Sequence, residues 1–183
     1  MNSFNIQLNK KVLLISILSI LIFNLSGCKH KNRRPILDNS GNHKELKQII
    51  YGFDNPPKFR KDGELRFLNS NKDTLFFINT EVVNTDVERM RGLMFRPEMD
   101  ENNGMLFIME KEDYQSFYMR NTIIPLDIIY INSNCEIVDI YKNTKVRDET
   151  SLPSSAVAKY VVEINAGLCD KYNIEKGNFV VIY

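Results

Sequence analysis

The chain has 183 residues, with 24 Lys and Arg against 23 Asp and Glu and a formal net charge of +1. This balance excludes the strongly basic composition of nucleic-acid-binding domains, so we expect no nucleic-acid partner. Both histidines, His30 and His43, precede the expected domain, which therefore has no imidazole for a Ser-His or Cys-His pair or for a zinc site. We expect neither a metal nor a cofactor.

The first segment has the features of a bacterial lipoprotein signal peptide. An uncharged apolar run over 12–25 follows two lysines and ends in the small pair Ser26-Gly27, directly before Cys28. At about 1.5 Å per residue the run spans about 21 Å, short of the roughly 30 Å hydrocarbon core, as in a signal-peptide h-region. We therefore expect a signal peptide over 1–27 and fatty-acyl chains such as palmitate on Cys28. The alternative is an uncleaved anchor helix.

Residues 28–63 have the composition of a tether between the lipid and a domain over 64–183. The tether starts with a basic run that can lie on anionic headgroups or be solvated, and the Pro56-Pro57 pair stands near its end. We expect the protein in the cell envelope, attached to the membrane through the lipid and facing the periplasm. Lys29 after the lipidated cysteine favours the outer membrane by the sorting rule of enteric bacteria.

From residue 64 onward, short β-type runs alternate with turn signals such as Asn103-Gly104 and Lys176-Gly177. So many strands in about 120 residues predict a mainly β fold, a single compact sandwich or barrel-like domain of about eight strands and two short helices. The expected strands cover 64–69, 74–84, 105–110, 115–120, 126–132, 135–141, 158–165 and 178–183.

Two helices are expected between these strands. Thr85 and Glu88 form a capping box, in which each side chain accepts an otherwise unpaired backbone N–H, and this helix should end near Gly92. The second helix should run from Ala166 to about Tyr172. The segment 142–159 contains a proline and two serines without a clear period, so we expect it to be a long loop.

The sulfur-containing residues leave alternatives open. Cys135 and Cys169 lie in a compartment that permits a disulfide, although no spacing signal brings them together. The thioether groups of methionine are soft ligands for Cu(I), but they also fill irregular hydrophobic cores. We favour the second interpretation, in which the methionines pack in the core. Six methionines follow the initiator within thirty residues: Met90, Met94, Met99, Met105, Met109 and Met119.

Two carboxylates, Asp127 and Glu163, are expected on inner strands. Strand period 2 places Asp127 on one face with Ile129, so its charge needs a partner, and Arg91 and Arg96 are the obvious candidates. The two carboxylates could form a general acid/base pair on one concave surface, or they could be separate structural ions.

Six runs in the expected domain share a recognisable pattern: 81–83, 91–96, 104–107, 117 with 119–122, 124–127 and 162–167. In this order they resemble the domain-of-unknown-function 192 family over residues 64–183. The resemblance implies a compact, mainly β, often exported or lipid-anchored domain, and it implies no activity. Tyr118 stands where the family usually has Trp, and Cys135 where its hairpin usually has Gly. The polar residues of these runs that match the family pattern are Arg91, Arg96, Asn121, Thr122, Asp127, Glu163 and Asn165.

The expected function is a membrane-anchored binding or accessory module. These matching polar residues would form a polar pocket for a small polar ligand or for a loop of an envelope protein. The alternative is a carboxylate-dependent enzyme that acts on an envelope glycan or a similar polar substrate through Asp127 and Glu163.

Overall fold

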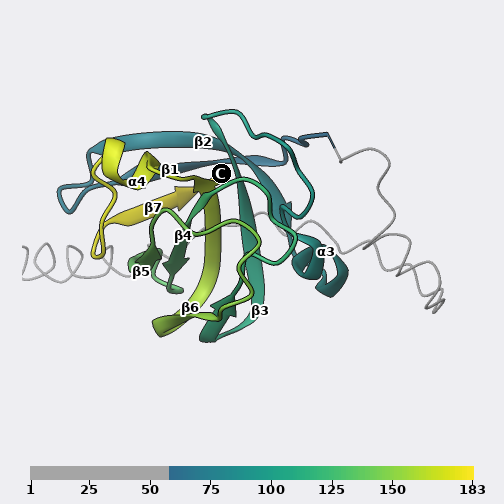
Figure 1. The fold of residues 1–183 in the computed structure, drawn as a ribbon. Coiled ribbons are helices and arrows are strands. Elements are labelled where there is room, and N and C mark those ends of the chain that lie inside the picture. The colour runs from purple at the N-terminus through teal and green to yellow at the C-terminus, as the bar shows by residue number, and fades with distance from the viewer. Residues whose placement is uncertain (1–57) are drawn as a thin grey trace, which may run out of the picture.

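The computed structural model describes residues 58–183, so the expected signal peptide, Cys28 and most of the tether lie outside the described residues. Within 58–183, seven strands form one sheet in the order β5-β4-β6-β3-β2-β1-β7 (Figure 1). The elements are β1 (Gly63–Leu68), β2 (Thr74–Val83), α3 (Asp86–Arg91), β3 (Asn103–Phe117), β4 (Leu126–Ile131), β5 (Ile137–Tyr141), β6 (Leu152–Asn165), α4 (Leu168–Lys171) and β7 (Phe179–Ile182). A search of this same range finds no helix with the length and apolarity needed to cross a membrane.

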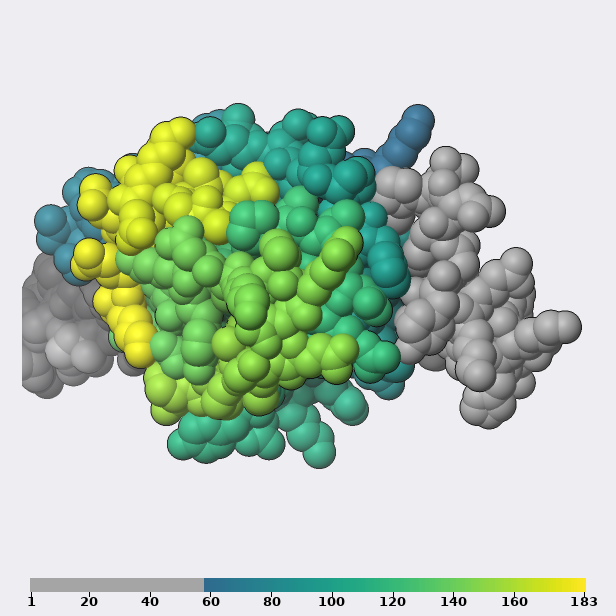
Figure 2. Space-filling model, viewed as in Figure 1, coloured from purple at the N-terminus to yellow at the C-terminus, as the bar shows by residue number. Residues whose placement is uncertain are grey.

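The sheet curls into a half-barrel because its two edges approach each other. The Ile137 amide donates to the Asn178 carbonyl at 2.8 Å, and the Val180 amide donates to the Cys135 carbonyl at 2.8 Å. Figure 2 shows the result on the visible face, where the yellow C-terminal residues lie against the green β4–β5 region. Neighbouring strands are antiparallel except β2 and β3, which are parallel and are connected through α3.

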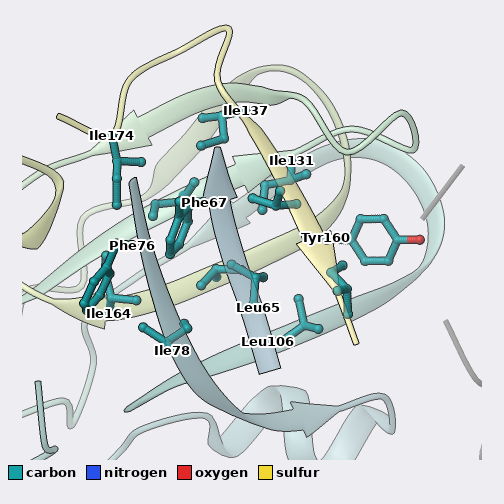
Figure 3. Packing of buried hydrophobic residues seen from close by; sticks show 14 of the residues in the cluster. Leu65, Phe67, Phe76, Ile78, Leu106, Ile131, Ile137, Tyr160, Ile164 and Ile174 are labelled. Carbon is teal, nitrogen blue, oxygen red and sulfur yellow. The ribbon is translucent and has the colours of Figure 1, made fainter. Parts of the chain in front are cut away.

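The concave side of the sheet holds the inner core, a cluster to which all seven strands and the α4 region contribute. Figure 3 shows many of these side chains converging between the strands. Leu65, Phe67, Ile78 and Leu106 are fully buried there. Complete removal of such side chains from water contributes about 1.5–3 kcal/mol each, so this core is the main source of stability.

The convex side carries a second cluster, the outer core, formed on β3, β6 and β4 and by the segments that cover them. Phe107 packs edge-on against Phe117 with ring centroids 4.9 Å apart. Leu93, from the turn after α3, is buried in the same cluster. Both faces of β3, β6 and β4 are therefore covered where they pass between the two clusters, so a polar side chain on either face is buried there.

The mainly β prediction is confirmed, with seven strands where about eight were expected. The run 105–110 and the first half of the run 115–120 belong to the single strand β3, which continues through the exposed residues 111–114 and ends at Phe117. The expected strand is wrong for 118–120, which lie outside β3. Pairing with β6 holds this part of β3, with irregularities in register between Ile108 and Asp113 and between Tyr114 and Ser116. Charged residues that suggested a turn are solvent-facing strand positions instead.

The expected loop over 142–159 is wrong for its second half, because β6 begins at Leu152. Ser116 of β3 pairs with Pro153, and the Ser154 hydroxyl accepts the Gln115 amide at 3.0 Å. The Tyr130 hydroxyl also donates to the Leu152 carbonyl at 2.5 Å. These partners are distant in sequence, so no local period indicates the strand.

Local signals at the helices and one turn are confirmed. Thr85 caps α3 with both halves of the capping box present, and Gly92 ends the helix at a φ of 47°. The shorter helix α4 lies within the expected range. Cys135 adopts a φ of 63°, a left-handed conformation that glycine enters at less cost. This explains why a glycine suits the same hairpin position.

Candidate functional site

A pocket of about 480 Å³ lies between α3 and the convex face of the sheet. In Figure 1, α3 and α4 lie at opposite sides of the domain, so the pocket is far from α4. Apolar side chains form most of its lining, and the polar members come from α3, β3, β6 and one loop. The apolar members include Met90, Leu93, Met94, Phe107, Met109, Phe117 and Tyr118, and the polar members are Asp86, Arg89, Arg91, Ser116, Thr122 and Glu163.

Glu163, which lines the pocket, belongs to a row of residues that crosses four strands. Glu81 of β2 pairs with Met105 of β3, Met105 pairs with Glu163 of β6, and Glu163 pairs with Ile128 of β4. Residues paired in this way point to the same face of a sheet. Neighbouring strands are about 4.8 Å apart, so the backbones of the two glutamates are separated by roughly 10 Å.

In the first of these glutamates, Glu81, both carboxylate oxygens accept hydrogen bonds. Arg96 donates from Nη1 to Oε1 at 2.7 Å and from Nη2 to Oε2 at 2.6 Å, and both side chains are only 7% exposed. The backbone amide of Arg60 also donates to Oε1 at 2.8 Å. This two-point ion pair holds the turn after α3 against β2.

The second, Glu163, is buried without such a partner. It is 5% exposed, and within residues 58–183 its carboxyl group takes part in no hydrogen bond. Burial raises the pKa of Glu163 to about 8, and the positive charge of Arg96 opposes this rise. At neutral pH the carboxyl group is mainly protonated, so it can donate as well as accept a hydrogen bond.

Asp127 lies on the other face of the sheet. It pairs with Ile164 across β4 and β6, whereas Glu163 pairs with Ile128. The fully buried Asp127 carboxylate accepts the Asn143 amide at 2.8 Å and the Cys169 amide at 2.9 Å. The expected pairing of Asp127 with an arginine is therefore wrong, and the two carboxylates do not converge on one surface. Asp127 anchors α4 instead.

Only some of the other expected site residues lie in the pocket. Arg91 and Thr122 line the pocket with Glu163. Asn121 adopts a φ of 56° and its Nδ2 lies 3.9 Å from the sulfur of Met94, a wall residue. The Asn165 side chain donates to the Met99 carbonyl at 2.7 Å and so holds the loop before β3. Of the seven expected residues, three therefore line the pocket.

Sequence reasoning missed Glu81 and the apolar wall. Glu81 is a carboxylate beside the apolar pair Val82 and Val83 in an expected strand, a signal like the one that singled out Asp127 and Glu163. The wall residues are ordinary apolar types, and only the position of α3 over the sheet gives them a common cavity. Methionines 90, 94 and 109 belong to this wall, whereas Met105 and Met119 pack in the outer core.

Residues that could hold a metal are not gathered in the described range: a search of 58–183 finds no group of three or more His, Cys, Asp or Glu side chains with suitable positions. Cys169 is a free, buried thiol, so the Cys135–Cys169 disulfide does not form. Burial raises the pKa of this thiol, and the nearby Asp127 raises it further. A protonated, inaccessible thiol is a poor nucleophile.

Comparison with known proteins identifies a family for most of the described residues. Residues 67–182 match the DUF192 family, described as an uncharacterized ACR. The chain belongs to the DUF192 family. It is similar to UPF0127 proteins from Thermococcus sibiricus, with 27% identity over 113 residues (61% of this chain and 70% of that protein), and from Thermococcus gammatolerans, with 26% identity over 115 residues (62% and 72%).

Two solved structures share the fold of this DUF192 protein. One, from Sinorhizobium meliloti, is described as a candidate transcription regulator; the TM-score is 0.65 and the identity 26%, and the match covers 69% of this chain and 98% of that chain. The other, of unknown function, is from Novosphingobium aromaticivorans; the TM-score is 0.62 and the identity 31%, and the match covers 73% and 95%. The fold of the family member is thus well supported, and its activity has to be argued from the pocket.

Proposed function

We propose that this DUF192 protein is a cell-envelope binding module, anchored through a lipid on Cys28, whose pocket beneath α3 holds a small ligand. The observation that carries the proposal is Glu163, a buried carboxyl group without a hydrogen bond in the described range that lines a cavity of about 480 Å³. Cavities of roughly 300–1,000 Å³ with apolar walls and a few polar groups are typical ligand sites. A group from a ligand would satisfy the buried carboxyl.

The composition of the pocket refines the expectation of a polar ligand. Its wall is mainly apolar, and only a few polar groups, among them Glu163, Arg91 and Thr122, interrupt it. An entirely polar ligand would lose its hydration against this wall without compensation. The ligand that fits has an apolar body and one polar group.

The envelope location is supported by the sequence. The apolar run over 12–25 and the small residues before Cys28 are the features that a lipoprotein signal peptidase accepts. About thirty residues then separate Cys28 from β1. A tether of this length would let the domain meet ligands at the membrane surface or in the periplasm.

The enzyme alternative has less support. Catalysis by two carboxylates needs both groups at one cleft, roughly 5–9.5 Å apart. Asp127 and Glu163 are on opposite faces of the sheet, and Glu81, which does share a face with Glu163, is locked by Arg96. A single buried carboxyl in an apolar cavity fits recognition better than acid/base catalysis.

Native mass spectrometry tests the proposed binding. The full chain is purified from membranes as wild type, as Met109→Trp, which fills the pocket, and as the control Val157→Trp, which adds the same ring at an exposed position outside it. We expect a co-purifying small molecule on the wild type and the control, and its absence from Met109→Trp. The same bound species on all three proteins, or none on any, would contradict the proposal.

A further inference from the structure

We propose that the ligand is an uncharged amphipathic amide, whose amide group pairs with the carboxyl group of Glu163 while its aliphatic body lies along the apolar wall of the pocket. This inference rests on the proposed function, because it assumes that the pocket binds a ligand at all. Glu163 is buried, lines the pocket beneath α3 and takes part in no hydrogen bond within residues 58–183. A ligand head group would supply the hydrogen bonds that this carboxyl group does not find in the described range.

Three arginines at or near the pocket, all in the described part of the chain, are already engaged. Arg96 donates with both Nη atoms to Glu81. Arg89 forms a close ion pair with Asp86. Arg91 likewise has an interaction of its own. An anionic head group would have to compete for these cations or lose its hydration in an apolar pocket without a counter-charge, and both are costly.

A cationic head group is disfavoured for a different reason. It would need an ionised Glu163, although this carboxyl group is buried in a pocket lined by apolar side chains such as Phe107 and Phe117. The positive charge of Arg96 is near enough to act on Glu163, so it would also repel the cation. Burial raises the pKa of Glu163 to about 8, so the group is mainly protonated at neutral pH. The pocket therefore suits an uncharged head group.

The protonated carboxyl group selects among uncharged head groups. It presents one O–H donor and one carbonyl acceptor side by side. A primary amide presents a carbonyl acceptor and an N–H donor in the same planar arrangement, so the two groups form two hydrogen bonds. A ketone or an ester has no donor and forms one. Each bond left unmade away from water is costly, so the amide is favoured over these groups.

The rest of the lining favours an aliphatic body. Leu93 and Phe107 are buried in the wall, whereas Met90 and Tyr118 line the same pocket and are exposed to solvent. The lining is thus apolar in its buried part and in its solvent-facing part. A chain whose polar end meets the buried Glu163 therefore keeps apolar contacts as far as Met90 and Tyr118, and these contacts remove apolar surface from water.

The groups around Glu163 define how binding should depend on pH. The arginines among them stay charged, and each of the two other acids forms an ion pair with an arginine. Tyrosines ordinarily titrate above pH 9, and burial raises the pKa of Tyr130 further. Glu163 is therefore the group whose charge should change between pH 6.5 and 9. The set comprises Asp86, Arg89 and Arg91 of α3, Arg96 after α3, Glu81 of β2, Tyr118 after β3 and Tyr130 of β4.

Methionine methyl groups serve as reporters for a test. Met90, Met94 and Met109 line the pocket, while Met99 lies outside it and is the internal reference. The full chain, labelled with ¹³C at the methionine methyls and held in lipid nanodiscs, is titrated at pH 6.5 with hexanamide, heptan-2-one, hexanoate and hexylamine. Empty nanodiscs are the blank. The probes share a pentyl chain and differ in head group, and heptan-2-one has a methyl group in place of the NH₂ group of hexanamide. We expect hexanamide to shift the pocket methyls with an apparent Kd about tenfold lower than that of each other probe.

Two substitutions at Glu163 test the pairing itself. Glu163→Leu removes the donor and the acceptor, so it should abolish the preference for hexanamide over heptan-2-one and leave heptan-2-one binding in place. Glu163→Gln keeps one donor and one acceptor, so it should keep the preference. Glu175→Gln, an exposed substitution outside the pocket, should leave all four titrations unchanged. The dispersion of the methyl spectrum shows whether each variant is folded.

Repeating the hexanamide titration from pH 6.5 to 9 tests the protonation of the carboxyl group. Binding to the wild type should weaken by about tenfold as Glu163 ionises, because the carboxylate has no donor for the amide carbonyl. Glu163→Gln does not titrate, so its binding should stay constant. Wild-type binding that does not vary with pH would overturn the pairing with a protonated carboxyl group.

The head-group comparison in the wild type separates this inference from the proposed function. Tighter binding of any other probe, equal binding of all four, or a preference for hexanamide that survives Glu163→Leu would overturn the amide proposal and leave a ligand pocket. A co-purifying molecule that Met109→Trp loses, with no methyl shift from any probe, would likewise overturn the ligand class alone. Absence of both the co-purifying molecule and the methyl shifts would overturn the pocket function and this inference together.

Discussion

Asp127 and Glu163 lie on neighbouring strands, one residue out of register with each other, and for that reason their side chains point to opposite faces of the sheet. Asp127 accepts two backbone amides beside the inner core. Glu163 reaches the pocket on the convex face, where no group in the described range donates to it. The charge of Asp127 therefore stabilises the fold, whereas a charge on Glu163 destabilises it. Replacing each acid with its amide should change the free energy of unfolding in opposite directions.

Glu163 should make the folded state less stable as pH rises. Its pKa is about 8 in the folded protein against an ordinary value of 4.5, so between these values the folded state keeps a proton that the unfolded state has lost. The free energy of unfolding should fall in this window, by up to about 1.4 kcal/mol per pH unit from this group, and should level off above it. Urea unfolding of wild type and Glu163→Gln from pH 4 to 9 measures the difference.

In that experiment Glu163→Gln should match the wild type near pH 4 and become the more stable protein by pH 9. The exposed substitution Glu110→Gln serves as the control and should leave the slope unchanged. A difference between wild type and Glu163→Gln that does not vary with pH would show that Glu163 has the same protonation in both states.

Asp127→Asn should destabilise the protein by about 3 kcal/mol. The amide can accept only through one oxygen, so one of the buried backbone N–H groups, from Asn143 or Cys169, loses its charge-assisted bond. Asp170→Asn, on the helix α4 that Asp127 anchors but with a side chain 61% exposed, should cost no more than about 1 kcal/mol. Chemical denaturation of both variants gives the comparison.

The effects of Asp127→Asn and Arg96→Met should add to within about 0.5 kcal/mol, because the two residues share no partner. A larger coupling in the double-mutant cycle would mean that an arginine does balance Asp127, contrary to the hydrogen bonds described above.

Arg96→Met should destabilise the fold by about 3–5 kcal/mol, since it leaves the Glu81 carboxylate buried without its counter-charge. The double variant Glu81→Leu/Arg96→Met should recover much of this loss. Lys171→Met, which removes an exposed ion pair with Glu101, should have little effect in the same unfolding assay.

Loss of Arg96 should also raise the pKa of Glu163 further, because the positive charge of Arg96 lowers it in the wild type. Carboxyl ¹³C NMR titration of the folded Glu81→Leu/Arg96→Met protein measures this shift. An unchanged or lower pKa would show that the charge of Arg96 does not reach Glu163.

Cys28→Ser should abolish fatty-acid labelling and release the domain from membranes, because Cys28 follows the apolar run and its small pair directly. Radiolabelled palmitate and membrane fractionation measure the two effects, with Cys169→Ser as the control for loss of a thiol. Continued labelling and membrane association of Cys28→Ser would contradict the lipoprotein prediction.

Much of the fold could be predicted because its signals are local. The capping box of Thr85 and Glu88 and the glycine at 92 define α3 through residues that lie within it or next to it in sequence. Alternation of apolar residues indicates strands such as β4, whose faces follow from a period of two. The continuous β3 and the first half of β6 lack such a signal. They are strands because 113–117 and 152–158 pair with each other, about forty residues apart in sequence.

The sequence by itself determined that Asp127, Glu163 and Glu81 are carboxylates in apolar strands, where each needs a partner or a shifted pKa. Only the tertiary structure decided which of these side chains lie on the same face of the sheet. A period of two assigns faces within one strand, but the faces of two strands are related through their pairing register, and a shift of one residue reverses that relation. The register places Glu163 with Glu81 and sends Asp127 to the inner core. The position of α3 over the sheet then turns one buried carboxyl into the floor of a pocket.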